Sequence, residues 1–235
     1  MIWLGIDTSN IPLSIAVVQD EQLLVEWTSS TKVAHSIGAM PAVEEALKQA
    51  NIKPGEIDAI AVAEGPGSYT GVRIGVTIAK TLAWTLKIPI VGVSSLQTLA
   101  GNASLFTGLI CPIMDARRQN VFSAVYTNEL KPVLPDGHYA LDAILEKLST
   151  GEEDILFIGK DVEIHWETIQ HVLGERAKRA PLHLDLPRAS VVIEQAMTKQ
   201  LPSIEETHHF VPDYKRITEA ETNWLAEQKQ VGRSE

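Results

Sequence analysis

Three polar residues, Asp7, Thr8 and Ser9, follow the apolar run at positions 2–6 and place a carboxylate beside two hydroxyl groups at the end of an expected strand. Such a group can hold a metal ion or a phosphate. Loops that bind phosphate usually contain a glycine, because backbone N–H groups must approach the phosphate closely. No glycine stands among these three residues, which are also typical of an ordinary turn. Two interpretations stay open at this point: a structural turn, or the remnant of a ligand-binding loop.

A second candidate is the glycine-rich segment at positions 65–75, which reads GPGSYTGVRIG and joins an apolar run to a helical pattern. Free N–H groups at a helix N-terminus can cradle an anion at such a junction. The segment matches neither G-x-G-x-x-G nor G-x-x-x-x-G-K-[ST], because Thr70 takes the sixth position and no lysine follows the loop. The sequence therefore predicts no nucleotide fingerprint here.

The histidines offer no metal clamp, because none of the seven is followed by another four residues later. No G-x-S-x-G elbow and no Cys-His signature is present either. We therefore expect a non-catalytic chain with no metal site and no tightly bound cofactor. The histidines are His35, His138, His165, His171, His183, His208 and His209.

The charge of the chain argues against direct binding of nucleic acid. The formal net charge is −10, which opposes a polyanionic backbone, so any tRNA contact is expected to be indirect. The densest basic group, Arg176, Lys178 and Arg179, is interpreted as the solvated end of a helix.

Composition and segment lengths indicate a globular protein of the cytoplasm. Of 235 residues, 45% are hydrophobic and 21% charged, which is close to the globular average. The single cysteine, Cys111, lies in an apolar run and cannot close an intramolecular disulfide. No signal peptide and no apolar stretch of membrane-spanning length is evident, so we expect no membrane contact.

The elements that must position these residues follow a repeated order. Three strands and a helix, then strand, helix, strand and helix, make up the first half, and a degenerate version begins again at residue 109. The alternation predicts an α/β protein with mixed sheets flanked by helices. The expected strands are 2–6, 13–18, 23–27, 57–63, 88–93, 109–114, 121–126, 131–139 and 155–158. The expected helices are 34–50, 70–86, 94–103, 141–148, 162–173, 190–199 and 219–228.

The repeat also predicts the boundaries of two lobes. The first lobe is expected at residues 1–103 and the second, degenerate lobe at residues 104–211. A C-terminal helix within residues 212–230 is expected to pack back onto the first lobe.

One face of the helix at 70–86 carries almost no side-chain bulk, because Gly71, Gly75, Ala79 and Ala83 recur at every fourth position. Small residues at this spacing permit close approach of another element. The other faces are apolar too, apart from one polar stripe. The pattern is typical of a helix that is central to a core or shared with another subunit.

Five motifs at separate positions carry a family resemblance. They are IDTS at 6–9, the His35-Ser36 start of a helix, GPGSYTGVRIG at 65–75, AKTLAWTLKIPIVGVSSLQTLA at 79–100 and VPDYKRITEAE at 211–221. With these motifs the chain resembles the TsaB family. The resemblance implies a duplicated actin-like fold, shared with acetate and sugar kinases, heat-shock chaperones and actin. It also implies a non-catalytic role beside a TsaD-like catalytic paralogue and a TsaE-like ATPase, in forming N6-threonylcarbamoyladenosine next to the tRNA anticodon.

The same resemblance implies that a metal site has been lost. TsaD carries a segment of the type N-H-L-E-x-H, whose two histidines bind metal. In this chain Ser95 and Leu99 stand at those two positions. A leucine offers no donor atom, and serine is a poor ligand at neutral pH.

The resemblance further implies a partner surface on the helices at 34–50 and 70–86, shared with TsaD or, when the chain is alone, with a second copy of itself. It leaves open a nucleotide, ATP or ADP, at the junction with TsaD. The expected contact residues are Ile37, Met40, Leu47, Gly71, Gly75, Ile78, Ala79 and Leu82.

Two alternatives compete with a scaffold role. The first is an actin-like phosphotransferase or ATPase, with Asp7 as the metal or base residue and Asp115 in a second phosphate-facing loop. The missing glycine argues against it, although Asp115 and Arg117 are candidates to line a cleft between the lobes. Together with Asp7, Thr8 and Ser9 they are candidates for a vestigial nucleotide site. The second is a metallopeptidase, which requires a metal site that the sequence does not show.

Overall fold

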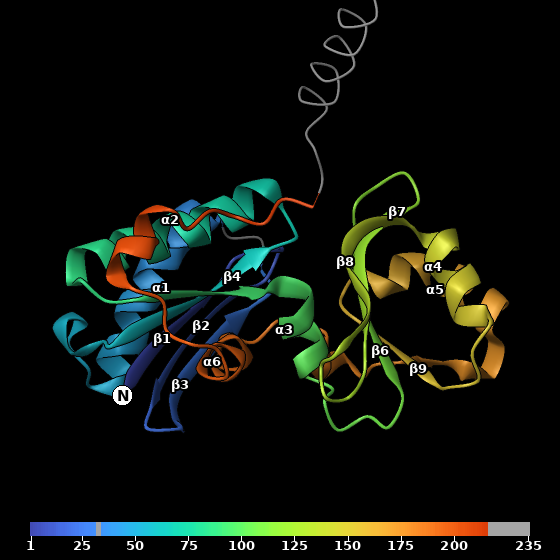
Figure 1. Cartoon of the computed structure of the whole chain (residues 1–235), viewed down its shortest axis with the longest axis horizontal. Coiled ribbons are helices and arrows are strands. Elements are labelled where there is room, and N and C mark those ends of the chain that lie inside the picture. Colours follow the sequence, from blue (N-terminus) through green and yellow to red (C-terminus); the bar gives the residue numbers. More distant parts are fainter. Residues whose placement is uncertain (32–33, 216–235) are drawn as a thin grey trace, which may run out of the picture.

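Residues 1–31 and 34–215 are described by the computed structural model, in which two lobes lie side by side (Figure 1). Each lobe contains a five-stranded mixed sheet flanked by helices, which confirms the fold class expected from the sequence. The helix expected within residues 212–230 lies outside the described residues from position 216 onward.

The first sheet consists of β1 (Ile2–Asp7), β2 (Leu13–Gln19), β3 (Gln22–Ser29), β4 (Ala59–Gly65) and β5 (Ile90–Ser94). Its strand order is β3-β2-β1-β4-β5. Short polar turns separate the first three apolar runs, so β1, β2 and β3 form an antiparallel meander. β4 and β5 each follow a helix and therefore pair in parallel with their neighbours.

One face of this sheet is covered by α1 (His35–Ala50) and α2 (Tyr69–Leu86). The Ser68 hydroxyl accepts the Gly71 N–H at 3.3 Å, and this cap begins α2 directly after the glycine-rich loop. Because β4 leads into that loop, the N-terminus of α2 lies at the edge of the sheet where β1 and β4 both end.

The second sheet repeats the first. Its strands are β6 (Leu109–Asp115), β7 (Asn120–Tyr126), β8 (Pro132–Ala140), β9 (Ile155–Ile158) and β10 (Ala177–Arg179), in the order β8-β7-β6-β9-β10. The outer face is covered by α4 (Leu141–Ser149) and α5 (Val162–Leu173). Strand for strand, this is the order of the first sheet, so the structure shows the predicted duplication.

Two helices cross between the lobes. α3 (Ser95–Gly101) follows β5 but packs on β6 and β7 of the second sheet. α6 (Ala189–Met197) follows β10 but packs on β1, β2 and β4 of the first sheet. The lobes expected at residues 1–103 and 104–211 place α3 in the first lobe and α6 in the second, whereas each helix packs mainly on the sheet of the other lobe. The exchange buries one apolar face of each sheet under a helix from the other half of the chain.

The basic group near residue 178 is also corrected. Residues 177–179 form edge strand β10 rather than the end of a helix. Arg176 donates to the carbonyl groups of Gly151 and Leu148 at 2.6 and 3.0 Å, and Arg179 pairs with the buried Asp185 at 2.6 Å. Lys178 donates to the Glu175 carbonyl at 2.7 Å, so all three cations are held by contacts within the lobe.

No helix in residues 1–31 and 34–215 has the length and apolar content that a bilayer crossing requires.

Candidate functional site

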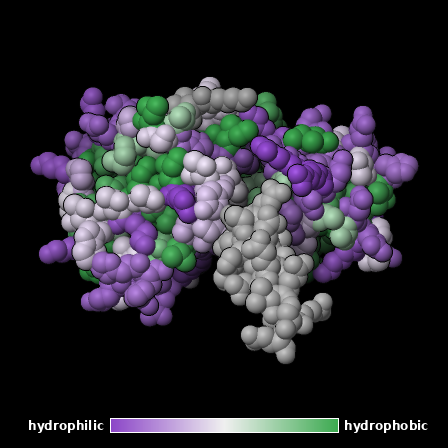
Figure 2. All heavy atoms as spheres, turned by 90° about the horizontal axis from the view of Figure 1, so that it is seen from above, coloured by the Kyte–Doolittle hydropathy of each residue, from purple (hydrophilic) through white to green (hydrophobic). Residues whose placement is uncertain are grey.

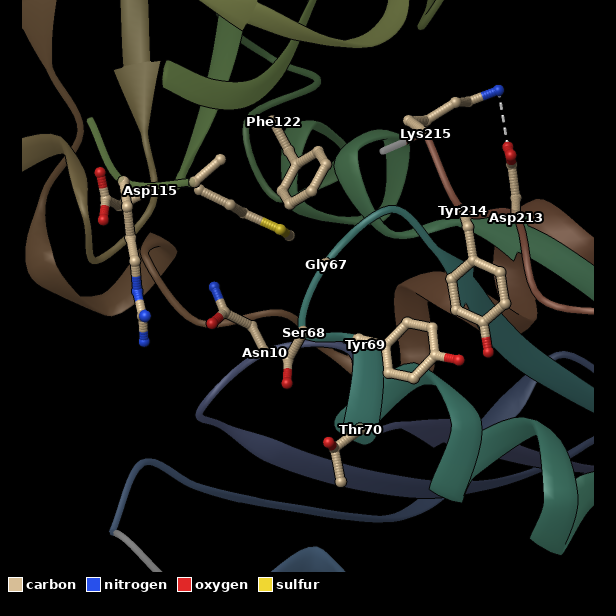
Figure 3. Close-up of a pocket in the computed structure, with 13 residues that line it drawn as sticks. Asn10, Gly67, Ser68, Tyr69, Thr70, Asp115, Phe122, Asp213, Tyr214 and Lys215 are labelled. Carbon is tan, nitrogen blue, oxygen red and sulfur yellow. Dashed lines mark ion pairs between the residues drawn. The ribbon is translucent and has the colours of Figure 1, made fainter. Parts of the chain in front are cut away.

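A cleft of about 550 Å³ lies between the two lobes. The first lobe contributes the glycine-rich loop and the start of α2, and the second lobe contributes the end of β6 and the turn after it (Figure 3). The segment at 213–215 forms a third wall. The lining side chains include Asn10, Ser68, Tyr69, Thr70, Asp115, Arg117, Phe122, Tyr214 and Lys215.

Two of the predicted cleft residues lie in this wall. Asp115 ends β6, and its Oδ1 lies 3.1 Å from Nε2 of His165, a side chain that is buried beneath the wall. The Asp115 N–H donates to the Asp161 carboxylate at 2.9 Å, so the aspartate is held from two directions. Arg117 begins a turn of three left-handed residues that projects the loop toward the cleft.

The other three predicted cleft residues lie elsewhere. Asp7, Thr8 and Ser9 are fully buried and do not line the cleft. Thr8 Oγ1 donates to the Gly71 carbonyl at 2.7 Å, and the Ser9 carbonyl accepts the Ser68 N–H at 2.7 Å. These contacts join the end of β1 to the N-terminus of α2. The three residues therefore do not join Asp115 and Arg117 in the wall of the cleft, and their burial favours the interpretation as a turn.

Burial governs the electrostatics of this turn. Asp7 Oδ1 accepts hydrogen bonds from the Ser9 N–H at 2.8 Å and the Ser9 hydroxyl at 2.7 Å. Oδ2 has no hydrogen-bond partner among the residues that the structure describes. Desolvation raises the pKa of Asp7 to about 6, although both bonds from Ser9 act in the opposite direction.

Stability is expected to fall as Asp7 ionises. Its folded-state pKa lies above the ordinary value of 3.8. The stabilisation that neutral Asp7 gives the folded state is therefore fully present below pH 4 and is lost as the pH rises through about 6. Between pH 4 and pH 7 the free energy of unfolding should drop by about 2 kcal/mol relative to an Asp7→Asn variant. Urea unfolding of both proteins at several pH values measures this difference. Asp142→Asn, at an exposed position of α4, is the control and should follow the wild-type curve.

An aromatic pair at the mouth of the cleft is a feature that sequence reasoning missed. The rings of Tyr69 and Tyr214 stack with centroids 4.8 Å apart, and Arg73 donates to both hydroxyl groups at 2.6 and 3.3 Å. The VPDYK motif therefore closes one side of the cleft (Figure 3). The only signal was the motif itself, because Tyr214 lies 141 residues beyond Arg73 in the chain.

The predicted partner residues divide into two groups. Leu47, Gly71, Gly75 and Ala79 are buried within the first lobe. A Cβ atom built on Gly71 would lie 2.3 Å from the Thr8 carbonyl oxygen, and one built on Gly75 would lie 2.4 Å from Thr8 Oγ1. The small stripe of α2 therefore makes room for the turn after β1, and its assignment to a partner surface is corrected.

The remaining four predicted residues form what we call the α1–α2 face: Ile37, Met40, Ile78 and Leu82. Ile37 is 74% exposed and Met40 45% exposed, whereas Ile78 and Leu82 are half-buried. The opposite flank of α2 is covered, because Lys80 donates to the carbonyl groups of His208 and Phe210, and Trp84 contacts the His208 ring. Figure 2 shows hydrophobic surface among polar surface over the first lobe, on the side where α2 runs.

The two positions at which the resemblance implies a lost metal site, Ser95 and Leu99, are part of the protein core. Ser95 Oγ accepts the Gly65 N–H at 3.2 Å and thereby holds the glycine-rich loop. Leu99 is buried among the residues that join α3 to the second sheet. Within residues 1–31 and 34–215, no cluster of three or more His, Cys, Asp or Glu side chains is arranged to hold a metal ion.

Comparison with known proteins gives a consistent set of relatives. The family model described as TsaD: tRNA N6-adenosine threonylcarbamoyltransferase matches residues 27–224. The tRNA threonylcarbamoyladenosine biosynthesis protein TsaB of Bacillus subtilis is 44% identical, with 97% of this chain and 100% of that protein covered. The protein of the same description from Escherichia coli is 34% identical over 54% of this chain and 55% of its own.

Solved structures agree on the fold. A Pseudomonas aeruginosa protein described as similar to the peptidase YEAZ superposes with a TM-score of 0.74 at 23% identity, over 92% of this chain and 99% of that one. YeaZ from the same organism gives a TM-score of 0.72 at 22% identity, over 91% and 99%.

Proposed function

Because the chain belongs to the TsaB family and so has a role in tRNA threonylcarbamoyladenosine biosynthesis, we propose that it is a non-catalytic scaffold subunit of the modifying complex. Its partners in this proposal are a TsaD-like transferase and a TsaE-like ATPase. The complex transfers threonylcarbamoyl from threonylcarbamoyl-AMP to N6 of the adenosine next to the anticodon, in tRNAs that read codons beginning with A. The chain acts in the cytoplasm and contacts tRNA only indirectly.

The observation that carries the proposal is that the residues at the candidate metal and phosphate positions are buried and used for packing. Ser95 and Leu99 are buried, and Ser95 holds the glycine-rich loop. Asp7 and Thr8 are buried against the same loop and do not reach the cleft. A site for phosphoryl transfer or metal chemistry needs accessible groups that converge on a substrate. These residues are instead used for packing: Asp7, Thr8 and Ser95 hold the glycine-rich loop region of the first lobe, and Leu99 packs against the second sheet.

The partner surface in this proposal is the α1–α2 face. Exposed apolar side chains on adjacent helices are typical of an interface, and the other flank of α2 is already covered by residues 204–210. A TsaD-like partner, or a second copy of this chain when it is alone, covers Ile37 and Met40. Any ATP or ADP is bound at the junction with TsaD in this proposal.

Reconstitution tests the proposal directly. TsaD and TsaE with tRNA and threonylcarbamoyl-AMP are expected to form modified tRNA at least about tenfold faster when this chain is added, because the scaffold completes the assembly. Mass spectrometry of digested tRNA measures the product. The isolated chain is expected to turn over no ATP. ATP hydrolysis by the chain alone would support the phosphotransferase alternative, and an unchanged modification rate would contradict the scaffold role.

A further inference from the structure

The second lobe contains an apolar groove of about 400 Å³. It lies where β6 and β9 begin, whereas the interlobe cleft lies where β6 ends. We call it the α4 groove. It lies between the C-terminal half of α4 and the end of the second sheet where β7 finishes and β8 begins. Its walls are predominantly aliphatic and include Val125, Val133, Leu134, Ile144 and Leu148.

The groove exists because the second lobe has a shortened covering helix. In the first lobe, α1 has 16 residues and packs along β2 and β3. Its counterpart in the repeated order, α4, has only 9 residues. At 1.5 Å per residue the two helices extend about 24 Å and about 14 Å, so α4 cannot cover the full length of a nine-residue strand. The start of β8 remains open, with Val133 48% exposed and Leu134 half-buried, whereas Val125 at the end of β7 is buried beneath it.

The rim of the groove carries an excess of positive charge. Lys147 and Arg176 border it, against the single carboxylate of Glu153. The Arg176 guanidinium is fixed by the carbonyl groups of Leu148 and Gly151, so it serves as a rigid wall. Lys147 is exposed, and no side chain in the described part of the chain pairs with its ammonium group. An apolar cavity beside an unpaired ammonium group is complementary to an apolar body with an anionic end.

We propose that the α4 groove binds a medium-chain aliphatic carboxylate, with its chain along Val133 and Leu134, above the buried side chains of Val125 and Ile144, and its carboxylate at Lys147. The size is suitable, because pockets that hold small ligands begin at about 300 Å³. Burial of each additional methylene should strengthen binding about fourfold until the groove is full. The site is independent of the α1–α2 face and of the role in tRNA modification.

Methyl NMR of the full-length chain tests this proposal. The protein, labelled at Ile, Leu and Val methyl groups, is titrated with hexanoate, octanoate and decanoate, each below its micelle-forming concentration. Shifts are expected at Val125, Ile144 and Leu148 and not at Ile15 or Val62 in the core of the first lobe. The dissociation constant should fall about fourfold per methylene along the series.

Two variants separate the apolar and the anionic parts of the site. Val133 is 48% exposed, so Val133→Trp should fill the groove without unfolding the lobe and should abolish the shifts. Val172→Trp, on the exposed face of α5 outside the groove, is the matched control and should bind normally. Lys147→Glu should weaken decanoate about fivefold or more at low ionic strength and leave decanol unchanged.

Several outcomes would overturn the proposal. Shifts spread over both lobes would indicate non-specific detergent-like binding. Equal affinity for decanol and decanoate would identify a neutral occupant instead of an anion. Normal decanoate binding by Val133→Trp would place the ligand elsewhere on the protein.

Discussion

A double variant, Ile37→Glu with Met40→Glu, is expected to lose its association with TsaD, and to lose self-association, while remaining folded. Both side chains are exposed in the isolated chain, at 74% and 45%, so their replacement leaves no cavity in the core. At a partner contact the same changes bury two unpaired carboxylates. Central contact residues contribute about 2 kcal/mol each, so the dissociation constant should rise on the order of a thousandfold. Light scattering after gel filtration and calorimetric titration with TsaD measure the loss.

The matched control is Ile164→Glu, because Ile164 is 65% exposed on α5 of the other lobe. It introduces one negative charge, against two in the double variant, on a similarly accessible isoleucine away from the α1–α2 face. This variant should bind TsaD as the wild type does. Equal binding by the double variant and the control would remove the α1–α2 face as the partner surface.

The order of strands was predictable because it depends on patterns within short segments. The apolar runs and their polar turns repeat in both halves of the chain, and the two sheets have the same strand order. β10 was missed because its three residues include two cations and offer no apolar run. The exchange of α3 and α6 was also missed. Local periodicity shows that a helix has an apolar face but not which sheet covers that face.

The main error at the candidate site concerned which neighbour packs against the small-residue face of α2. The spacing of Gly71, Gly75 and Ala79 indicates close packing, and the structure shows such packing with the turn after β1. Sequence periodicity does not distinguish a neighbour within the same lobe from a neighbour in another subunit. The apolar positions that do remain exposed, Ile37 and Met40, were in the same predicted set.

The cleft shows a related difficulty. Asp115 and Arg117 lie in its wall, as expected from the repeat, because β6 occupies the place in the second sheet that β1 occupies in the first. The symmetry of the repeat did not extend to Asp7, since Thr8 and Ser9 hold that turn against α2. Tyr214 reaches the cleft only through the path of the C-terminal segment along α2. Long-range paths of this kind leave no periodic signal in the sequence.

Gly75→Ala is expected to destabilise the isolated chain, although intrinsic helix propensity predicts the reverse. Replacing glycine by alanine inside a helix normally stabilises a protein by about 1 kcal/mol. Here the new Cβ atom would lie 2.4 Å from Thr8 Oγ1, and Thr8 is buried and bonded to the Gly71 carbonyl, so it cannot move away freely. Overpacking of this kind costs about 2–3 kcal/mol. Chemical denaturation should therefore show a net loss of about 1–2 kcal/mol.

Combining Gly75→Ala with Thr8→Ala tests whether Thr8 is the residue that the new Cβ atom contacts. Thr8→Ala removes Oγ1, so Gly75→Ala in that background should regain the stabilising sign, with a coupling energy of about 2–3 kcal/mol between the two positions. Gly55→Ala is the control, because a Cβ atom there meets no atom within 4 Å and should change little. If Gly75 instead faced a partner subunit, Gly75→Ala would stabilise the isolated chain and weaken only its complex with TsaD. The sign of one alanine substitution thus decides whether the small face of α2 belongs to the lobe or to the interface.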